Sequence, residues 1–162
     1  MDVRSTLHFL DLATGAEISS INALVSDTFS GYFLPGNATF VFQSDDMRIR
    51  AADIVTAQLV YTGEDFMYIV QDWIFCEERN TLAVINSSQT ILFAMNGTIE
   101  PIAKVPKFCG FSDDGSSFYV LTDNVLGELP YRDLDDLLQM ARETLNGAQL
   151  SAENRIKYYV DE

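Results

Sequence analysis

The chain contains a single histidine, His8, so any catalytic arrangement that needs an imidazole would have to use it. A Ser-His-Asp or Cys-His site requires such a base beside its nucleophile. His8 alternates with the apolar residues Leu7 and Phe9, which is typical of an ordinary exposed position on a β-strand. The sequence therefore favours a non-catalytic role for His8 and predicts that the protein is not an enzyme.

Pairs of neighbouring acids offer two other kinds of chemistry. Asp45-Asp46 and Asp113-Asp114 supply the oxygen ligands that calcium prefers, although neither stretch has the spacing of a known calcium loop. Glu64-Asp65 and Glu77-Glu78 supply carboxylates of the type used by glycosidases, but sequence neighbours need not face each other across a substrate. We expect all of these acids to be solvated residues near turns.

The sequence lacks the residue patterns that metal and cofactor sites need. Zinc sites require clustered Cys and His, whereas Cys76 and Cys109 are far apart and accompany only one histidine. Both cysteines lie in strand-like apolar runs, so we expect buried free thiols in place of a disulfide. No glycine-rich phosphate loop opens a helix, and no Gly-Lys-Ser or Gly-Lys-Thr occurs. We expect no cofactor and no metal.

An aromatic-rich stretch is the strongest candidate for a partner or ligand surface. It contains Trp73, Tyr68, Phe75 and Tyr61, with Phe66 among them. Alternation along a strand places Trp73 and Phe75 on one face. Packing between sheets would use the same residues in the same arrangement. Both interpretations stay open at this point.

The net charge of −14, from 24 acidic and ten basic residues, restricts the class of partner. Such a field repels phosphate backbones and argues against nucleic-acid binding, whereas it suits a solvated surface or a basic protein partner. No apolar run reaches the roughly 18 residues of a membrane span. The N-terminal stretch also lacks the continuous apolar core of a signal peptide. We therefore expect a cytoplasmic protein that does not contact a membrane.

The elements that must position these residues recur along the chain as two alternating sets of hairpins. In the first set the turns fall near Thr14, Thr56 and Gly97, at intervals of about 42 residues, which is typical of repeat architectures. The hairpins of this set span Leu7–Ile18, Met47–Val60 and Thr90–Ile102. Their flanking residues are β-branched or aromatic, as strands prefer.

The second set has turns rich in polar residues and glycine. Its hairpins span Gly31–Phe42, Asp72–Ile85 and Phe108–Leu121. Pro35-Gly36-Asn37 and Asp113-Asp114-Gly115 are good turn sequences, because Gly and Asn accept positive φ and Pro presets φ. Inner and outer hairpins that alternate in this way are typical of consecutive antiparallel propeller blades.

We therefore predict an all-β fold of antiparallel β-propeller blades over residues 1–132. An outer hairpin occupies residues 5–22, full blades occupy 23–66 and 67–106, and a partial blade occupies 107–132. Within the partial blade, residues 125–129 form a third strand. Apolar residues then recur at helical spacing, so residues 133–162 are predicted to form a helical extension that Asp133 and Ser151 help to cap.

Several of these stretches resemble WD-repeat β-propeller proteins. Phe111–Gly115 is similar to the Phe-Ser-Pro-Asp-Gly turn of that family, and Phe33–Asn37 is a looser version of it. The stretch Ser44–Asp53 is similar to the strand segment of the WD-repeat family that ends in Trp-Asp, with Ala52 at the Trp position. Leu10-Asp11 stands in the place of a second Trp-Asp. The resemblance implies a propeller that binds protein partners.

The C-terminal residues resemble a more specific group. Asp133–Leu138, Ala141-Arg142, Leu150–Arg155 and Tyr158-Tyr159 look like the closing segment of bacterial STAND-type signalling NTPases. Those proteins carry an ATPase module upstream and end in a WD propeller with such a tail. The resemblance implies the sensor end of a signalling protein, or a stand-alone relative, without ATPase chemistry.

About three blades cannot close a ring, because propellers need at least four. The initial outer hairpin and the final inner strands are complementary, so two chains could close a ring of about six blades with two-fold symmetry. We predict a homodimer, or else a fragment whose missing blades lie upstream.

These observations favour a non-enzymatic module for protein binding, scaffolding or sensing. The alternative is a small-molecule or peptide sensor with its ligand at the propeller axis, near the aromatic stretch. An enzyme, such as a hydrolase that uses the paired acids, ranks third.

Overall fold

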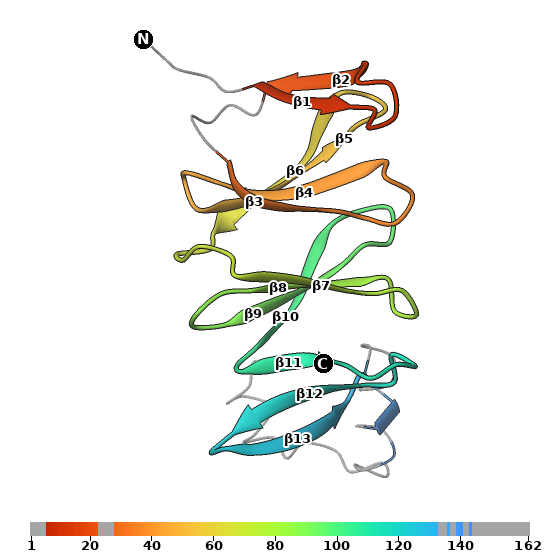
Figure 1. The fold of residues 1–162 in the computed structure, drawn as a ribbon. Helices are drawn as coiled ribbons and strands as arrows, with labels where there is room; N and C mark the ends of the chain where they lie inside the picture. The colour runs from red at the N-terminus through yellow and green to blue at the C-terminus, as the bar shows by residue number, and fades with distance from the viewer. Residues whose placement is uncertain (1–5, 23–27, 133–135, 137–138, 141–142, 144–162) are drawn as a thin grey trace, which may run out of the picture. The chain divides into compact units, whose positions relative to one another are not determined.

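The computed structural model of the chain describes residues 6–22 and 28–132, together with Asp136, Gln139, Met140 and Glu143. Over these residues the fold is all-β, with thirteen strands in four antiparallel sheets (Figure 1), and this confirms the all-β antiparallel class. The chain divides into two compact units, Met1–Leu129 and Pro130–Glu162. In the part that is described, no helix is both long and apolar enough to cross a membrane.

Each sheet is a meander in which neighbouring strands follow one another along the chain. The first sheet contains β1 (Thr6–Leu10) and β2 (Glu17–Asn22). The second contains β3 (Thr28–Phe33), β4 (Thr39–Ser44), β5 (Arg48–Asp53) and β6 (Gln58–Asp65). The third contains β7 (Asp72–Cys76), β8 (Thr81–Ile85), β9 (Thr90–Ala94) and β10 (Glu100–Val105). The fourth contains β11 (Phe108–Phe111), β12 (Ser117–Thr122) and β13 (Val125–Pro130).

Local turn chemistry explains where the strands reverse. In the β1–β2 turn, Asp11 accepts hydrogen bonds from the backbone N–H groups of Ala13 and Thr14, and Gly15 has a φ of 71°. Asn37 and Asn80 occupy the left-handed region, with φ of 54° and 46°, which Asn tolerates better than most residues. The hairpins that were predicted on both sets of turns are confirmed by the strand pairing.

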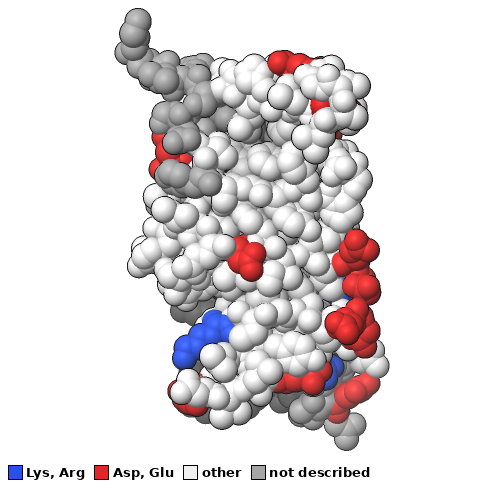
Figure 2. All heavy atoms as spheres, viewed as in Figure 1, with Lys and Arg blue, Asp and Glu red and all other residues white. Residues whose placement is uncertain are grey.

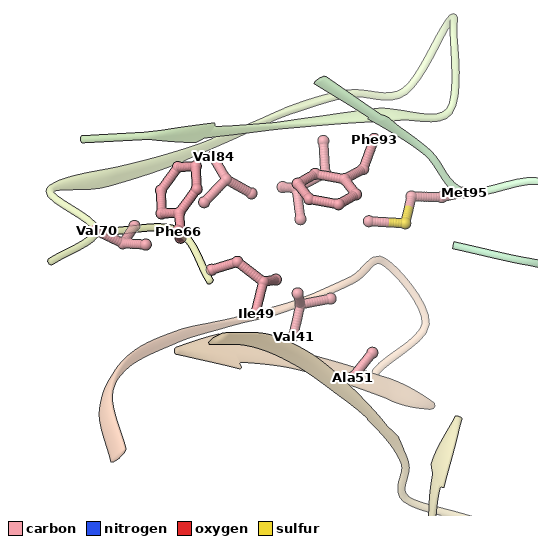
Figure 3. Close-up of a cluster of buried hydrophobic side chains, with 9 residues drawn as sticks. Val41, Ile49, Ala51, Phe66, Val70, Val84, Phe93 and Met95 are labelled. Atoms are coloured by element: carbon pink, nitrogen blue, oxygen red, sulfur yellow. The ribbon is translucent and has the colours of Figure 1, made fainter. Parts of the chain in front are cut away.

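The second and third sheets pack against each other through a continuous apolar core. Side chains from one sheet point toward those of the other in Figure 3, with Val41, Ile49 and Ala51 opposite Val84 and Phe93. All five are almost completely buried. Full burial of one large apolar side chain contributes about 1.5–3 kcal/mol, so this interface is a main source of stability for the first unit.

Strand β4 is covered on both of its faces. Val41 lies in the core shared with the third sheet, whereas its neighbour Phe42 packs with Phe9, Ile21 and Ala52 in a second core shared with the first sheet. Because alternate side chains of a strand point to opposite faces, a strand that is buried on both faces shows a continuous apolar run. The sequence Thr-Phe-Val-Phe is therefore explained by its position between two sheets.

Buried amides hold the connection between the second and third sheets. Gln43, which is fully buried in β4, donates to the carbonyl of Tyr68 at 2.8 Å and accepts from the Val70 amide at 2.7 Å. Asn86, after β8, donates to the carbonyl of Phe66 at 3.2 Å. Polar backbone groups of a buried connection need such partners, so side chains from both sheets fix this linker.

The third and fourth sheets meet at two hairpin turns. Arg79 donates from Nε to the carbonyl oxygen of Gly115 at 2.9 Å. A Cβ atom built on Gly115 would lie 2.9 Å from Cβ of Glu78 and 3.0 Å from Sγ of Cys76. Gly115 also has a φ of 65°. Both its conformation and the close approach of the β7–β8 turn therefore require glycine.

The two cysteines differ in their surroundings. Both are free thiols, as expected, and Cys76 is buried, but Cys109 is exposed, which corrects the expectation of two buried thiols. Cys109 lies between Phe108 and Gly110, where the register between β11 and β12 shifts, so it is the extra residue of a β-bulge and has no partner residue in the ladder. Burial raises the pKa of the Cys76 thiol.

In the C-terminal unit, Asp136, Gln139, Met140 and Glu143 have helical conformation. The Gln139 amide donates to the Glu143 carboxylate at 2.8 Å. The two residues are four positions apart, a separation that brings side chains together on one face of a helix. The remainder of the predicted helical extension at 133–162, including both expected caps, lies outside the described residues.

Candidate functional site

The four aromatic residues that the sequence analysis proposed as a surface lie in different environments. Tyr61, Trp73 and Phe75 are half-buried and pack against the core between the second and third sheets. The indole N–H of Trp73 donates to the hydroxyl of Ser30 at 3.3 Å. Tyr68 lies in the β6–β7 linker and is 47% exposed. Three of the four therefore belong to the edge of a core, and Tyr68 lies on the surface.

Two of these aromatic residues line hollows in the first unit. The turn-side hollow, of about 380 Å³, is lined by Leu34, Pro35, Thr39, Phe75, Glu77, Asn80 and Met95. The strand-side hollow, of about 350 Å³, is lined by residues of the second and third sheets that include Tyr61. Both volumes lie at the lower end of the range for small-ligand pockets.

Hairpin turns build the turn-side hollow. Leu34 and Pro35 come from the β3–β4 turn, and Glu77 and Asn80 come from the β7–β8 turn. The Asn80 amide donates to the carbonyl of Met95 at 2.5 Å and to Oδ1 of Asn96 at 3.1 Å, so it ties the β7–β8 turn to the β9–β10 turn. The lining is thus mixed, with apolar side chains beside the polar Thr39 and Asn80, and among the lining residues that the structure describes Glu77 is the ionisable one.

Four exposed acids lie in two hairpin turns that meet, and one of them, Glu77, also lines this hollow. Glu77 and Glu78 lie in the β7–β8 turn, and Asp113 and Asp114 lie in the β11–β12 turn. The two turns touch, because Gly115 approaches Glu78 closely and accepts the Arg79 hydrogen bond. Figure 2 shows acidic groups grouped along the side of the molecule on which these hairpins reverse in Figure 1. We call Glu77, Glu78, Asp113 and Asp114 the acidic turns.

Hydrogen bonds within its own turn stabilise the ionised form of Asp114. The backbone N–H and hydroxyl of Ser116 donate to Oδ1 at 2.9 and 2.7 Å, and the hydroxyl of Ser112 donates to the same atom at 2.8 Å. These hydrogen bonds lower the pKa of Asp114 to about 2. Asp114 is exposed, as predicted for a turn acid, but the prediction did not include these hydrogen-bond donors.

Asp46, in contrast, belongs to an internal ion pair. Its two carboxylate oxygens accept from Nη1 and Nη2 of Arg50 at 2.6 Å each, and Oδ1 also accepts from the hydroxyl of Ser44 at 2.8 Å. Arg50 is 6% exposed. The guanidinium holds the pKa of Asp46 well below its usual range. Asp46 is exposed, as expected of a turn acid, but the prediction did not include this ion pair with the buried Arg50.

The remaining candidate residues are His8 and the pair Glu64-Asp65. His8 is an exposed strand residue, as expected, and its Nδ1 lies 3.0 Å from Oε2 of Glu17, a contact that lowers the pKa of Glu17. The side chains of Glu64 and Asp65 lie outside what the structure describes. Among the described residues no group of three or more His, Cys, Asp or Glu side chains is arranged to hold a metal ion.

Sequence reasoning missed both hollows and the contact between the acidic turns. Each depends on residues from different hairpins, such as Phe75 with Leu34, whose proximity no local pattern encodes. One signal was available. Glu77-Glu78 and Asp113-Asp114 occupy corresponding turns of consecutive sheets, so comparison of the hairpins would have placed the pairs side by side.

A comparison with protein-family models gives no match for this chain, and a comparison with curated protein sequences gives none either.

Proposed function

We propose that the chain is a non-enzymatic module of propeller type that binds protein partners, as a scaffold or a sensor in bacterial signalling. Meandering antiparallel sheets of four strands, packed face to face in chain order, support a propeller-like arrangement. The resemblance of the C-terminal residues to STAND-type signalling proteins supports the signalling role.

The observation that carries the proposal is the turn-side hollow with the acidic turns beside it. Lys and Arg side chains combine an apolar stem with a cationic end. The walls formed by Leu34, Phe75 and Met95 suit such a stem, and the carboxylate of Glu77 suits the cation. The neighbouring acids would attract a basic segment and raise its rate of association.

A display selection tests this proposal. Peptides from a randomised library are selected on the immobilised chain at low and at high salt. We expect enrichment of Lys or Arg next to an apolar residue, and weaker recovery at high salt because exposed charges are screened. Selection of neutral or acidic peptides, or recovery no better than from an uncoated surface, would count against a basic protein partner.

A second candidate function, a small-molecule sensor, is supported by the strand-side hollow that Tyr61 lines. This hollow has a different chemistry from the turn-side hollow, so the two candidates call for different ligands.

A further inference from the structure

The strand-side hollow concentrates positive charge in a strongly acidic chain. Among the lining residues whose side chains the structure describes, the charged ones are Arg48 and Lys104. The chain as a whole has 24 acidic and ten basic residues. These two cations favour the binding of an anionic group in the hollow.

The floor of the hollow is apolar and preformed. Ile49, Phe66 and Phe93 are 1–3% exposed and belong to the core between the second and third sheets. The rings of Tyr61 and Phe93 meet edge to face with their centroids 6.0 Å apart. Ligand sites typically combine such a fixed apolar floor with a few polar groups that orient the ligand.

Hydrogen bonds fix Arg48 at the rim of the hollow. Nη1 of Arg48 donates to the carbonyl oxygen of Gly63 at 3.2 Å, and this hydrogen bond ties the Arg48 side chain to β6. Its Nε lies 3.7 Å from Oδ2 of Asp46, but that carboxylate is engaged at 2.6 Å by Arg50. A guanidinium carries five N–H donors, so Arg48 can bind an anion in addition to these contacts.

Gly63 leaves room for the ring that forms one wall. A Cβ atom added to Gly63 would lie 2.7 Å from the hydroxyl oxygen of Tyr61. The two residues are two positions apart on β6, so they share a face of the strand. The position of the Tyr61 ring, and with it the shape of the hollow, depends on the absence of a side chain at Gly63.

We propose that the strand-side hollow binds a small amphipathic carboxylate, with its apolar body on the floor and its carboxylate between Arg48 and Lys104. This inference deepens the second candidate function and does not depend on the protein-binding role. The two cations belong to different sheets, β5 and β10, so a bound carboxylate would bridge the second and third sheets.

Titration calorimetry with three matched probes tests this assignment. The probes are 4-phenylbutanoate, its neutral amide and 4-phenylbutylamine, which differ in charge and share the same apolar body. We expect the carboxylate to bind with a Kd of about 1 mM or better. The amide should bind at least about tenfold more weakly, and the amine should not saturate.

Variants identify the site and separate it from general hydrophobic binding. Arg48→Gln and Lys104→Gln should each weaken carboxylate binding by about fivefold or more, whereas Lys107→Gln, a matched loss of charge outside the hollow, should leave it within about twofold. Gly63→Ala should weaken the carboxylate and the amide alike, because it displaces the ring of Tyr61.

Several outcomes would overturn the proposal. These are no saturable binding of 4-phenylbutanoate up to about 10 mM, equal affinity for carboxylate and amide, or equal effects of Lys107→Gln and the two hollow variants. None of these results bears on peptide selection at the turn-side hollow, so failure here and failure of the protein-binding function can be told apart.

Discussion

At the scale of single residues, acids in similar sequence contexts have different structural roles. Asp46 neutralises the buried Arg50, whereas Asp114 organises its own turn through Ser112 and Ser116. Glu77 contributes a carboxylate to the lining of the turn-side hollow. The sequence shows only that each acid lies near a turn. The hydrogen-bond and ion-pair partners of its carboxylate depend on the tertiary structure.

Removal of the Asp46 charge tests the internal ion pair. Asp46→Asn keeps the shape of the side chain but leaves the guanidinium of Arg50 uncompensated. We expect a loss of about 2 kcal/mol in the free energy of unfolding, less than the 3–5 kcal/mol typical of fully buried pairs, because Asp46 is partly exposed. Urea denaturation measures it. The double variant Asp46→Asn/Arg50→Met should recover part of the loss, and a neutral Asp46→Asn would show that the pair contributes nothing.

The pKa of Asp114 predicts how stability depends on pH. Because the folded state lowers this pKa from 3.8 to about 2, the unfolded state binds the proton more tightly. The stabilisation is therefore complete above about pH 4 and is lost as the pH falls toward 2. Urea denaturation between pH 2 and 7 should show a steeper loss of stability for the wild type than for Asp114→Ala. Parallel curves would contradict this account of the turn.

At the scale of elements, the hairpins were predictable and their mutual contacts were not. Alternating apolar residues and turns such as Pro35-Gly36-Asn37 encode strand, turn and strand locally. Gln43, in contrast, binds a linker 25 residues further along the chain, and a polar residue in a strand gives no sign of such a contact. The exposure of Cys109 was missed because the apolar run of β11 does not reveal the register shift between Phe108 and Gly110.

Two glycine variants test the contact between the third and fourth sheets. Gly115→Ala combines a positive φ with the close approach of Glu78, so we expect a loss of about 2–4 kcal/mol. Gly36→Ala is the matched control, because Gly36 also has a positive φ but no atom within 4 Å of the added methyl group. Its cost should be about 1 kcal/mol. Thermal or urea unfolding gives both values, and equal losses would mean that the two turns do not meet.

At the scale of the whole molecule, strand edges suggest how copies of the chain associate. In the described part of the chain the first sheet has two strands and the fourth has three. Strand β13 lies at the edge of the fourth sheet and exposes Val125 and Leu126, which are 67% and 61% exposed. Exposed apolar edge strands invite pairing with another chain. We propose a homodimer in which this edge pairs with the β1–β2 hairpin of a second copy and closes a ring of about six blades.

Light scattering of the purified chain tests the dimer. We expect a mass of twice 18.1 kDa for the wild type, and a shift toward monomer for Leu126→Lys, because a charge on the edge opposes pairing. Val55→Lys is the control, since Val55 is 79% exposed in the β5–β6 turn and belongs to neither of the two pairing elements. A monomeric wild type at micromolar concentration would contradict the proposed closure.

The central claim, that the turn-side hollow binds a basic side chain of a protein partner, is tested most directly by the affinity of a selected basic peptide for two charge-matched variants. Glu77→Gln removes the carboxylate of the hollow, whereas Asp123→Asn removes an acid at the opposite end of β12 from the acidic turns. Calorimetry should show at least about tenfold weaker binding to Glu77→Gln and a change of less than about twofold for Asp123→Asn. Equal affinity for the two variants would contradict the claim.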